Sequence, residues 1–370
     1  MSDLRRLLIV AGQLDTGGAE RELVTFLREV REMPLSIAVA SLSPSGALEK
    51  EVQVLTGREV ECPPSTSRIR RLMWMRAMVR DFRPDVIHAW NLFPLAYLAK
   101  RLYRRPCPVV GSLQHTPSQA IQEGMSPRLL RFLLRVPDGL VSNSHAALDC
   151  LGEMNVKPPC SAVVHNGVGR EFFSAKAGRD ATEARRGRLV VMGVGRLVPR
   201  KRFDWMIRLA ADLRGEGQPM DLWIVGEGAE RGGLERLADD LKVGGSVKFW
   251  GERMDVESIL PEADVYLHCA SAEGLPNSLQ EAMAAGLAVV APRTAGIPEI
   301  VVSGEEGLLY EVEDYLGCKD QLRRMLAEPS LRARLAREAR RKAETSFLPQ
   351  EMADKLLVFY SKVLANEATR

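Results

Sequence analysis

The sequence predicts an α/β protein made of two doubly wound, Rossmann-like lobes, each built on a parallel sheet. Short apolar runs of strand length alternate with helical patterns along the chain, which is typical of parallel strands joined by right-handed crossover helices. The chain has 370 residues. This is too long for one ordinary core and suits two domains of about 150–200 residues each.

The first series of elements predicts an N-terminal lobe over residues 1–175. Its apolar runs end in glycine-rich or polar segments, and helical patterns such as 68–82 separate several of them. The expected strands of this lobe are 7–11, 36–40, 86–88, 109–113, 139–142 and 162–164.

The second series predicts a C-terminal lobe over residues 189–346. Segment 176–188 is rich in Ala, Gly and charge and lacks apolar periodicity, so we expect a linker there. The chain is helical and charged over 317–345, and an amphipathic helical segment follows at 347–370. The expected strands of this lobe are 189–194, 221–225, 246–250, 265–268 and 288–291.

The charge distribution is uneven although the formal net charge is only +3. Residues 68–135 contain 13 basic and three acidic residues. One interpretation is a solvated basic face, and the other is a lobe that faces a phospholipid surface or a phosphorylated acceptor. No basic motif interleaved with aromatic residues is present, so we expect no nucleic-acid partner.

The six cysteines are scattered and contain no C-x-x-C pair, which argues against a zinc site and a disulfide framework. The first apolar run leads directly into Gln13 and Asp15, unlike a signal peptide. No apolar run approaches the length of a membrane span. We therefore expect a cytoplasmic protein, peripheral to the inner face of the membrane if the basic lobe binds lipid.

The strongest chemical pattern is the block 271–286, which follows a predicted strand. Glu273 lies in the loop after that strand, and Glu281 lies one turn into the next helix. Two carboxylates there can bind hydroxyls of a sugar and a ribose, and the helix start suits a phosphate. The alternative is an ordinary loop with two surface glutamates. The block also supplies Gly274, Leu275, Pro276, Asn277 and Ser278 around the helix start.

A basic loop follows the first strand of the second lobe. Arg196 and Lys201 lie five residues apart in it, and two such cations can neutralise a diphosphate as it leaves. The alternative is a basic surface turn. We expect the neighbouring Arg200 and Arg202 to be solvated.

Gly17 and Gly18 follow the first strand and open a helix, where glycines let the backbone approach a phosphate. This is not a dinucleotide-binding fingerprint, because no G-x-G-x-x-G stands there.

Glu273 and Glu281, with seven residues between them, resemble the Glu-x7-Glu signature of the retaining family-four glycosyltransferases, which have the GT-B fold. The resemblance extends over nearly the whole chain. Its further segments are 85–91, 142–145, 165–168, 193–201, 225–228, 249–252 and 296–299.

The resemblance implies two Rossmann-like lobes facing across a cleft, with a final helix that crosses back to the first lobe. It implies transfer of a hexose-type sugar with retention and without a metal or another cofactor. The donor would be a UDP-sugar, with GDP as the alternative, and the acceptor a saccharide or lipid-linked saccharide of cell-surface polysaccharide assembly.

The resemblance also assigns roles to individual residues. It places Arg196 and Lys201 on the diphosphate and His115 near the transferred sugar, although Thr116 stands where the family often has Asp or Asn. It places Glu299 in a loop near the donor, and the alternative is a cap of the next helix through its dipole. Trp250 and Arg253 are further candidates to flank the base, and the alternative for a Trp at a strand end is a place in the core.

Three alternatives to glycosyl transfer stay open at this point. One is another enzyme of the same architecture, such as a nucleotide-sugar epimerase or a phosphorylase. A dehydrogenase is disfavoured because the dinucleotide fingerprint is missing. The third is a non-catalytic membrane-associated binding protein. Arg128, Arg131 and Arg135, with apolar residues between them, suit either an interfacial helix or a helix packed on the lobe.

Overall fold

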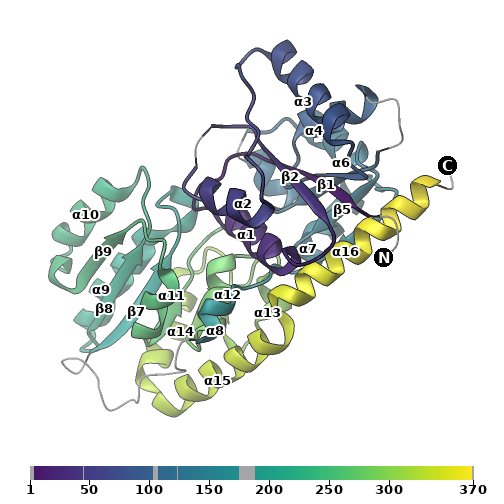
Figure 1. The fold of residues 1–370 in the computed structure, drawn as a ribbon. Helices are drawn as coiled ribbons and strands as arrows, with labels where there is room; N and C mark the ends of the chain where they lie inside the picture. Colours follow the sequence, from purple (N-terminus) through teal and green to yellow (C-terminus); the bar gives the residue numbers. More distant parts are fainter. Residues whose placement is uncertain (1–3, 45, 103–106, 123, 175–187, 369–370) are drawn as a thin grey trace. The chain divides into compact units, whose positions relative to one another are not determined.

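The computed structural model describes residues 4–44, 46–102, 107–122, 124–174 and 188–368, which form two compact units (Figure 1). Unit 1 comprises Met1–Gly167 and Pro349–Arg370, and unit 2 comprises Val168–Leu348. Each unit contains one six-stranded sheet in which all pairs of strands are parallel. The predicted fold class is therefore confirmed.

The sheet of unit 1 has the order β2-β1-β3-β4-β5-β6. Leu7 and Ile9 of β1 pack into one apolar cluster, and Leu8 and Val10 pack into another. Both faces of the sheet are covered, which is why the strand is a continuous apolar run rather than an alternating one. The strands are β1 (Arg6–Ala11), β2 (Ser36–Ser41), β3 (Val86–Ala89), β4 (Val109–Leu113), β5 (Gly139–Ser142) and β6 (Ser161–Val163).

The helices of unit 1 follow most of these strands in sequence, as expected for crossover connections. They are α1 (Gly18–Val30), α2 (Glu49–Thr56), α3 (Arg68–Phe82), α4 (Pro94–Leu102), α5 (Pro117–Gln122), α6 (Pro127–Arg135), α7 (His145–Glu153) and α16 (Pro349–Ala368).

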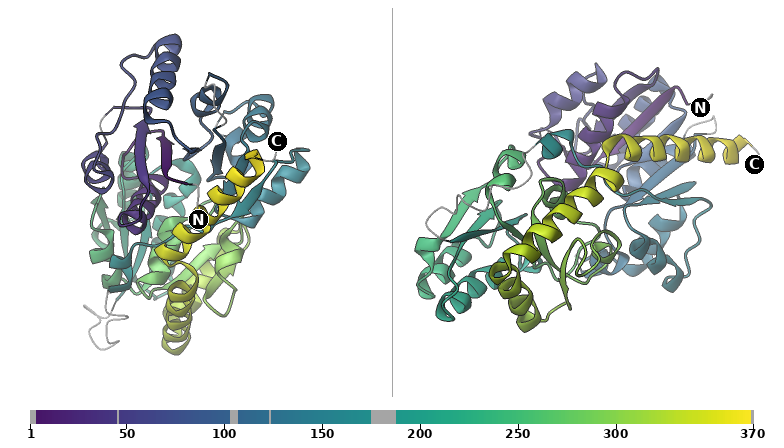
Figure 2. Two further views of the ribbon diagram at one scale, coloured as in Figure 1. Left: turned by 45° about the vertical axis from the view of Figure 1, so that its right-hand side comes forward. Right: turned by 90° about the horizontal axis from the view of Figure 1, so that it is seen from below.

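Helix α16 follows unit 2 in sequence but belongs to unit 1, as predicted (Figure 2). It packs on α1, where the rings of Phe26 and Tyr360 meet edge to face with their centroids 6.5 Å apart. At Gly139, an added Cβ would lie 2.7 Å from Val363 and 2.9 Å from Phe359. The absence of a side chain at this position therefore lets α16 lie directly on β5.

The sheet of unit 2 has the order β12-β11-β10-β7-β8-β9. Its strands are β7 (Leu189–Val194), β8 (Met220–Val225), β9 (Val247–Gly251), β10 (Val265–Leu267), β11 (Ala288–Pro292) and β12 (Gly307–Tyr310). Its helices are α8 (Arg170–Ser174), η2 (Pro199–Lys201), α9 (Phe203–Gly215), α10 (Arg231–Asp240), η3 (Gly244–Ser246), α11 (Val256–Ile259), η4 (Leu260–Glu262), α12 (Asn277–Ala284), α13 (Ile297–Ile300), α14 (Tyr315–Ala327) and α15 (Pro329–Ser346).

The helical stretch predicted at 317–345 consists of two helices rather than one. Glu328 between them has an extended backbone with φ −111° and ψ 87°. Proline can begin a helix but disfavours helical geometry at the preceding residue, so Pro329 separates α14 from α15.

The division between the units falls at Gly167 and Val168, whereas the sequence placed the end of the first lobe at 175. The amide of Val168 donates to the carbonyl of Phe347 at 2.9 Å, and Phe172 of α8 is buried in a core of unit 2. Apolar burial and this hydrogen bond therefore assign α8 to unit 2. Apart from Arg188, the predicted linker 176–188 lies outside the described residues.

Both sheets contain a point at which the strand order reverses. In unit 1 it lies between β1 and β3, and in unit 2 between β10 and β7. The loops that follow such a pair of strands leave the same edge of the sheet and run to opposite faces, which creates a crevice where ligands bind in open α/β sheets.

Candidate active site

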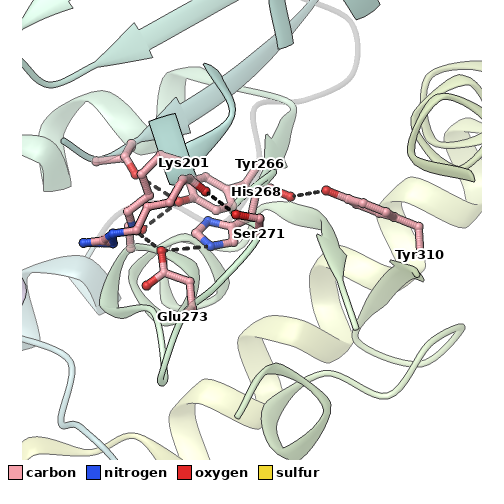
Figure 3. Close-up of polar contacts among 9 residues, drawn as sticks. Lys201, Tyr266, His268, Ser271, Glu273 and Tyr310 are labelled. Carbon is pink, nitrogen blue, oxygen red and sulfur yellow. Dashed lines mark hydrogen bonds and ion pairs between the residues drawn. The ribbon is translucent and has the colours of Figure 1, made fainter. Parts of the chain in front are cut away.

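Lys201 and Glu273 form a buried ion pair at the point of strand reversal in unit 2 (Figure 3). Lys201 lies in η2 after β7, and Glu273 lies in the loop after β10. Their side chains are only 15% and 7% exposed. The pairing stabilises both groups, because either charge buried alone would be desolvated without a compensating attraction.

Glu273 is held in its ionised form. Burial acts to raise the pKa of Glu273, but the charge of the Lys201 ammonium opposes it, and the pKa is held well below its usual value. An ammonium group has three N–H donors, and the Glu273 carboxylate accepts a hydrogen bond from one of them. The Lys201 ammonium can therefore stay paired with Glu273 and still donate to a second anion.

His268 completes this cluster and was not singled out by the sequence analysis. Its Nε2 lies 3.6 Å from Oε1 of Glu273, longer than a hydrogen bond, and its carbonyl accepts from the Tyr310 hydroxyl at 2.9 Å. Burial, followed by the Lys201 charge, lowers the pKa of His268, so the ring is neutral at pH 7. Its position at the end of a buried strand was the feature of the sequence that could have identified His268 as a site residue.

The loop after β7 is held by backbone contacts on two sides. Gly226, after β8, has φ +135°, and an added Cβ would lie 2.0 Å from the carbonyl oxygen of Gly195. On the other side, the Ser271 amide donates to the carbonyl of Arg200 at 2.8 Å. Lys201 is therefore positioned by rigid backbone and not only by its partner.

The loop after β10 leads into α12, which carries Glu281. Glu281 is 5% exposed, and Leu275 is buried next to the helix start. Ser278, in the first turn, accepts a hydrogen bond from Tyr266 of β10 at 2.7 Å. The remaining predicted residues of this segment form the approach to the helix, with Pro276 as the N-cap, Asn277 as the first helical residue and Gly274 accepting the Gly296 amide at 3.0 Å.

The three arginines of the basic loop are arranged differently, and Arg200 is half-buried. Arg196 is exposed after Gly195. Arg202 was expected to be solvated, and this was wrong: its guanidinium binds Glu313 at 3.0 Å and Asp204 at 3.4 Å. It also lies over the Trp205 ring at 4.5 Å. Ion pairs with Asp204 of α9 and with Glu313 after β12 therefore fix the position of the Arg202 side chain.

Trp250 and Arg253 lie at the end of β9 and in the loop that follows. Arg253 binds Asp255 through two hydrogen bonds of 2.8 and 2.6 Å, and its guanidinium carbon is 5.7 Å from the centre of the Trp250 ring. Lys248 lies 3.3 Å from the centre of the same ring. Glu299 lies in the first turn of α13 and is partly exposed.

The predicted residues of the first lobe lie in unit 1. Gly17 is the N-cap of α1 and Gly18 its first residue, with ordinary backbone geometry at Gly17. His115 lies in the loop after β4, one residue beyond Gln114, and is half-buried. Thr116 acts as a cap for α5, since its hydroxyl accepts from the Gln119 amide at 3.4 Å and lies 3.0 Å from the Ser118 hydroxyl.

Unit 2 thus brings Lys201 and Glu273 together, with Glu281 one helical turn from the same loop. Gly17 and His115 follow strands of unit 1 that are not neighbours, because β3 separates β1 from β4. Across the described segments, no three His, Cys, Asp or Glu side chains are grouped as metal ligands.

Comparison with known protein families identifies the family to which the chain belongs. Residues 16–172 match the model described as Glycosyltransferase Family 4, and residues 175–342 match the model described as Glycosyl transferases group 1. The chain belongs to the family-4 glycosyltransferases. The predicted family and the predicted class of enzyme, a retaining hexosyltransferase, are confirmed, and the epimerase, dehydrogenase and binding-protein alternatives are set aside.

This glycosyltransferase is similar along most of its length to characterised proteins. It is 28% identical over 344 residues to the lipopolysaccharide core biosynthesis glycosyltransferase LpsE of Rhizobium meliloti, covering 92% of this chain and 95% of LpsE. HepE of Anabaena, solved with UDP-glucose, superposes with a TM-score of 0.84 at 20% identity, over 96% of this chain and 99% of HepE. WaaG, a glycosyltransferase involved in lipopolysaccharide biosynthesis, gives a TM-score of 0.75 at 20% identity, over 95% and 99%.

In the part of the chain that the structure describes, the helices of this glycosyltransferase are too short or too polar to cross a bilayer.

Proposed function

We propose that this glycosyltransferase moves a hexose from a UDP-sugar to a saccharide or lipid-linked saccharide of the cell surface, with a GDP-sugar as the alternative donor. The buried Lys201–Glu273 pair carries the proposal, because it places a fixed cation where unit 2 would bind a diphosphate. The UDP-glucose complex of HepE supports the donor, and the lipopolysaccharide enzymes LpsE and WaaG support the acceptor class.

In the proposed reaction the bond between the anomeric carbon and the diphosphate oxygen breaks, and the acceptor hydroxyl attacks from the same face. Lys201, Arg196 and the amides at the start of α12 stabilise the negative charge that develops on the diphosphate. Glu281 binds hydroxyls of the donor, and Glu273 orients Lys201 and the transferred sugar. The leaving phosphate oxygen takes the proton of the acceptor hydroxyl.

The remaining predicted residues surround this centre in the proposal. His115 of unit 1 contacts the transferred sugar. The backbone at the start of α1 approaches the donor phosphate. The base lies near Trp250 and Arg253, and the donor loop includes Glu299. The residues of unit 1 and the α12 start that complete this set are Gly17, Gly18, Gly274, Leu275, Pro276, Asn277 and Ser278.

The experiment is a thermal-shift panel of UDP, GDP, ADP, NAD and the common sugar conjugates, each in EDTA and again with Mg²⁺. A ligand that binds only the native state raises the melting temperature. We expect UDP or GDP and its sugar to give the shift in EDTA. The shift is lost in Lys201→Ala and Glu281→Ala, and it is kept in Lys355→Ala, which removes an exposed lysine of α16.

Each part of the proposal can fail separately in this panel. A shift that requires Mg²⁺ contradicts metal-independent binding. A shift with NAD alone, or with no sugar nucleotide, contradicts the donor class.

We propose further that unit 1 docks peripherally on an anionic bilayer at the cytoplasmic side. Helix α6 buries Leu130, Leu133 and Leu134, while Leu129 and Phe132 are 46% and 53% exposed. Exposed Arg128, Arg131 and Arg135 accompany these two apolar side chains, so one surface of the helix is both basic and apolar. Helix α6, which the structure describes in full, contains no acidic residue.

Flotation with liposomes containing phosphatidylglycerol tests this docking. We expect wild-type protein to float at low salt and less at high salt, and the Arg128→Gln/Arg131→Gln/Arg135→Gln variant to stay at the bottom. The matched control removes three exposed arginines of unit 2, Arg323→Gln/Arg324→Gln/Arg341→Gln, and should float like wild type. Absence of wild-type flotation at low salt contradicts docking.

A further inference from the structure

Unit 1 contains a buried polar cluster that the proposed reaction does not use. Glu22 of α1 is 6% exposed, and Oε2 accepts a hydrogen bond from Nε2 of Gln114 at 2.9 Å. Nδ2 of Asn143 lies 3.3 Å from both the backbone oxygen and Oε1 of Gln114. These three residues, the Glu22 cluster, come from α1, from the loop after β4 and from the loop after β5.

The cluster holds the backbone directly before His115. Gln114 is 8% exposed, and its side chain is bound to Glu22 on one side while its carbonyl is bound to Asn143 on the other. Peptide planarity passes any shift of the Gln114 carbonyl to the next residue. The direction of His115 is therefore coupled to whether Glu22 keeps its bond to Gln114.

The surroundings of Glu22 favour a neutral carboxylic acid. Burial raises the pKa of Glu22, the hydrogen bond from Gln114 lowers it and the charge of Glu20 raises it, with a result of about 8. The pKa of the Tyr360 phenol, on α16, is raised by burial and then by the charge of Glu22. Asn143 adds an amide, which carries no charge.

Neither arginine of α1 is among the causes that set the pKa of Glu22, which are burial, Gln114 and Glu20. Arg21 precedes Glu22 on α1, and successive residues of a helix point in different directions. Arg28, further along α1, pairs with Glu51 of α2 at 2.6 Å. Behind Tyr360 lies His88, whose Nδ1 is 2.7 Å from the tyrosine hydroxyl; burial lowers its pKa to about 3, so it is neutral.

We propose that Glu22 is a positioning residue: as a neutral acid it holds Gln114, and through Gln114 it keeps the His115 loop in the geometry used for glycosyl transfer. This inference rests on the proposed role of His115 near the transferred sugar. Ionisation would leave a buried carboxylate with one amide donor, and such a group draws in water or further donors. The Glu22 cluster would then open and the loop would shift.

Nuclear magnetic resonance of ¹⁵N-histidine-labelled protein tests the coupling without any ligand. The chain has five histidines, and His115→Gln identifies the signal of His115. We expect the wild-type His115 signal to show an additional titration step near pH 8, as the pKa of Glu22 requires. Glu22→Gln keeps the shape of the side chain but cannot ionise, so this variant should lack the step.

The control is Glu32→Gln, which removes a carboxylate that is 94% exposed just after α1, and which should keep the step. A His115 signal without this step, or with the step unchanged in Glu22→Gln, overturns the proposal. Wild-type and Glu22→Gln spectra that agree elsewhere show that the variant is folded.

Hydrolysis of UDP-glucose, with water as acceptor, gives a second readout. We expect wild-type kcat to fall above pH 8, kcat of Glu22→Gln to stay level, and Glu22→Val to lose roughly tenfold or more at pH 7 through loss of positioning. Equal pH profiles for wild type and Glu22→Gln contradict the proposal. If wild-type protein turns over no sugar nucleotide, the proposed donor fails, and the histidine spectra still decide the role of Glu22.

Discussion

The two units are both built on a six-stranded parallel sheet with one reversal of strand order, but each buries a carboxyl group in an opposite electrostatic setting. In unit 2, Lys201 and Glu273 are buried together as a charged pair, and the pKa of Glu273 is held below its usual value. In unit 1, Glu22 is buried with amides and a phenol, and its pKa is raised to about 8. A neighbouring ammonium accounts for the difference, since both carboxyl groups are almost fully buried.

This contrast shows that the fold brings loops together while individual side chains decide the charge. A parallel sheet with one reversal gathers its loops at the same edge in either unit. A buried cation such as Lys201 can bind a diphosphate, whereas a neutral polar cluster such as the Glu22 cluster can hold a loop in one conformation. The predictions below test this distinction.

The largest effect is expected from Lys201→Ala. It should lower kcat on the order of 100- to 1,000-fold through loss of charge stabilisation on the leaving group. It should also destabilise unit 2 by about 3–5 kcal/mol, because Glu273 is left buried and unpaired. Steady-state kinetics and thermal unfolding measure the two effects. The double variant Lys201→Met/Glu273→Gln should recover stability without activity, and recovery of both would refute the assignment.

Gly226→Ala should destabilise unit 2 by about 3 kcal/mol, because the new Cβ meets the Gly195 carbonyl in addition to an unfavourable φ of +135°. The matched control is Gly217→Ala, which also has positive φ, +81°, but has no atom within 4 Å of the new Cβ. The control should lose only about 1 kcal/mol. Equal melting temperatures for the two variants would show that the close contact is not a constraint.

The two carboxyl groups should give opposite pH dependences of stability. The pKa of Glu273 is lower in the folded state, so its contribution is present above the unfolded value of 4.5 and is lost as pH falls below it. The pKa of Glu22 is higher, so its contribution is present below 4.5 and is lost as pH rises through about 8. Over its window each changes the folding equilibrium constant roughly tenfold per pH unit.

Melting temperatures from pH 3 to 9 check this, with each wild-type curve compared with that of the corresponding Gln variant. Glu273→Gln should approach wild type on the acid side, and Glu22→Gln should gain on wild type on the alkaline side. Curves that run parallel for either variant contradict the assigned charge state.

The smallest effect is expected from Tyr360→Phe, which leaves Nδ1 of His88 buried without its 2.7 Å partner and should cost about 1–2 kcal/mol. Tyr310→Phe in unit 2 removes a 2.9 Å bond to the His268 carbonyl and should cost a similar amount. Chemical denaturation followed by tryptophan fluorescence measures both. A loss in one variant only would show that one hydroxyl is not bound as described.

Much of the fold could be predicted because its determinants are local. Continuous apolar runs such as β1 and β7 have no polar face, so they indicate strands covered on both sides. The break between α14 and α15 could also have been predicted, since Pro329 stands in the sequence. The unit boundary could not, because α8 is assigned by the burial of Phe172 against residues distant in sequence.

The sequence by itself determined the alternation of strands and helices, the family, and which loops carry charged residues, because these follow from periodicity and from motifs along the chain. It did not give the sixth strand of unit 2, β12, which was not among the predicted strands. Only the tertiary structure decided which charges meet. It paired Lys201 with Glu273, placed His268 beside them and bound Arg202 to Glu313, residues up to 111 positions apart. It also buried Glu22 of α1 against Gln114, which is 92 positions away, and burial is the largest cause of the raised pKa of Glu22.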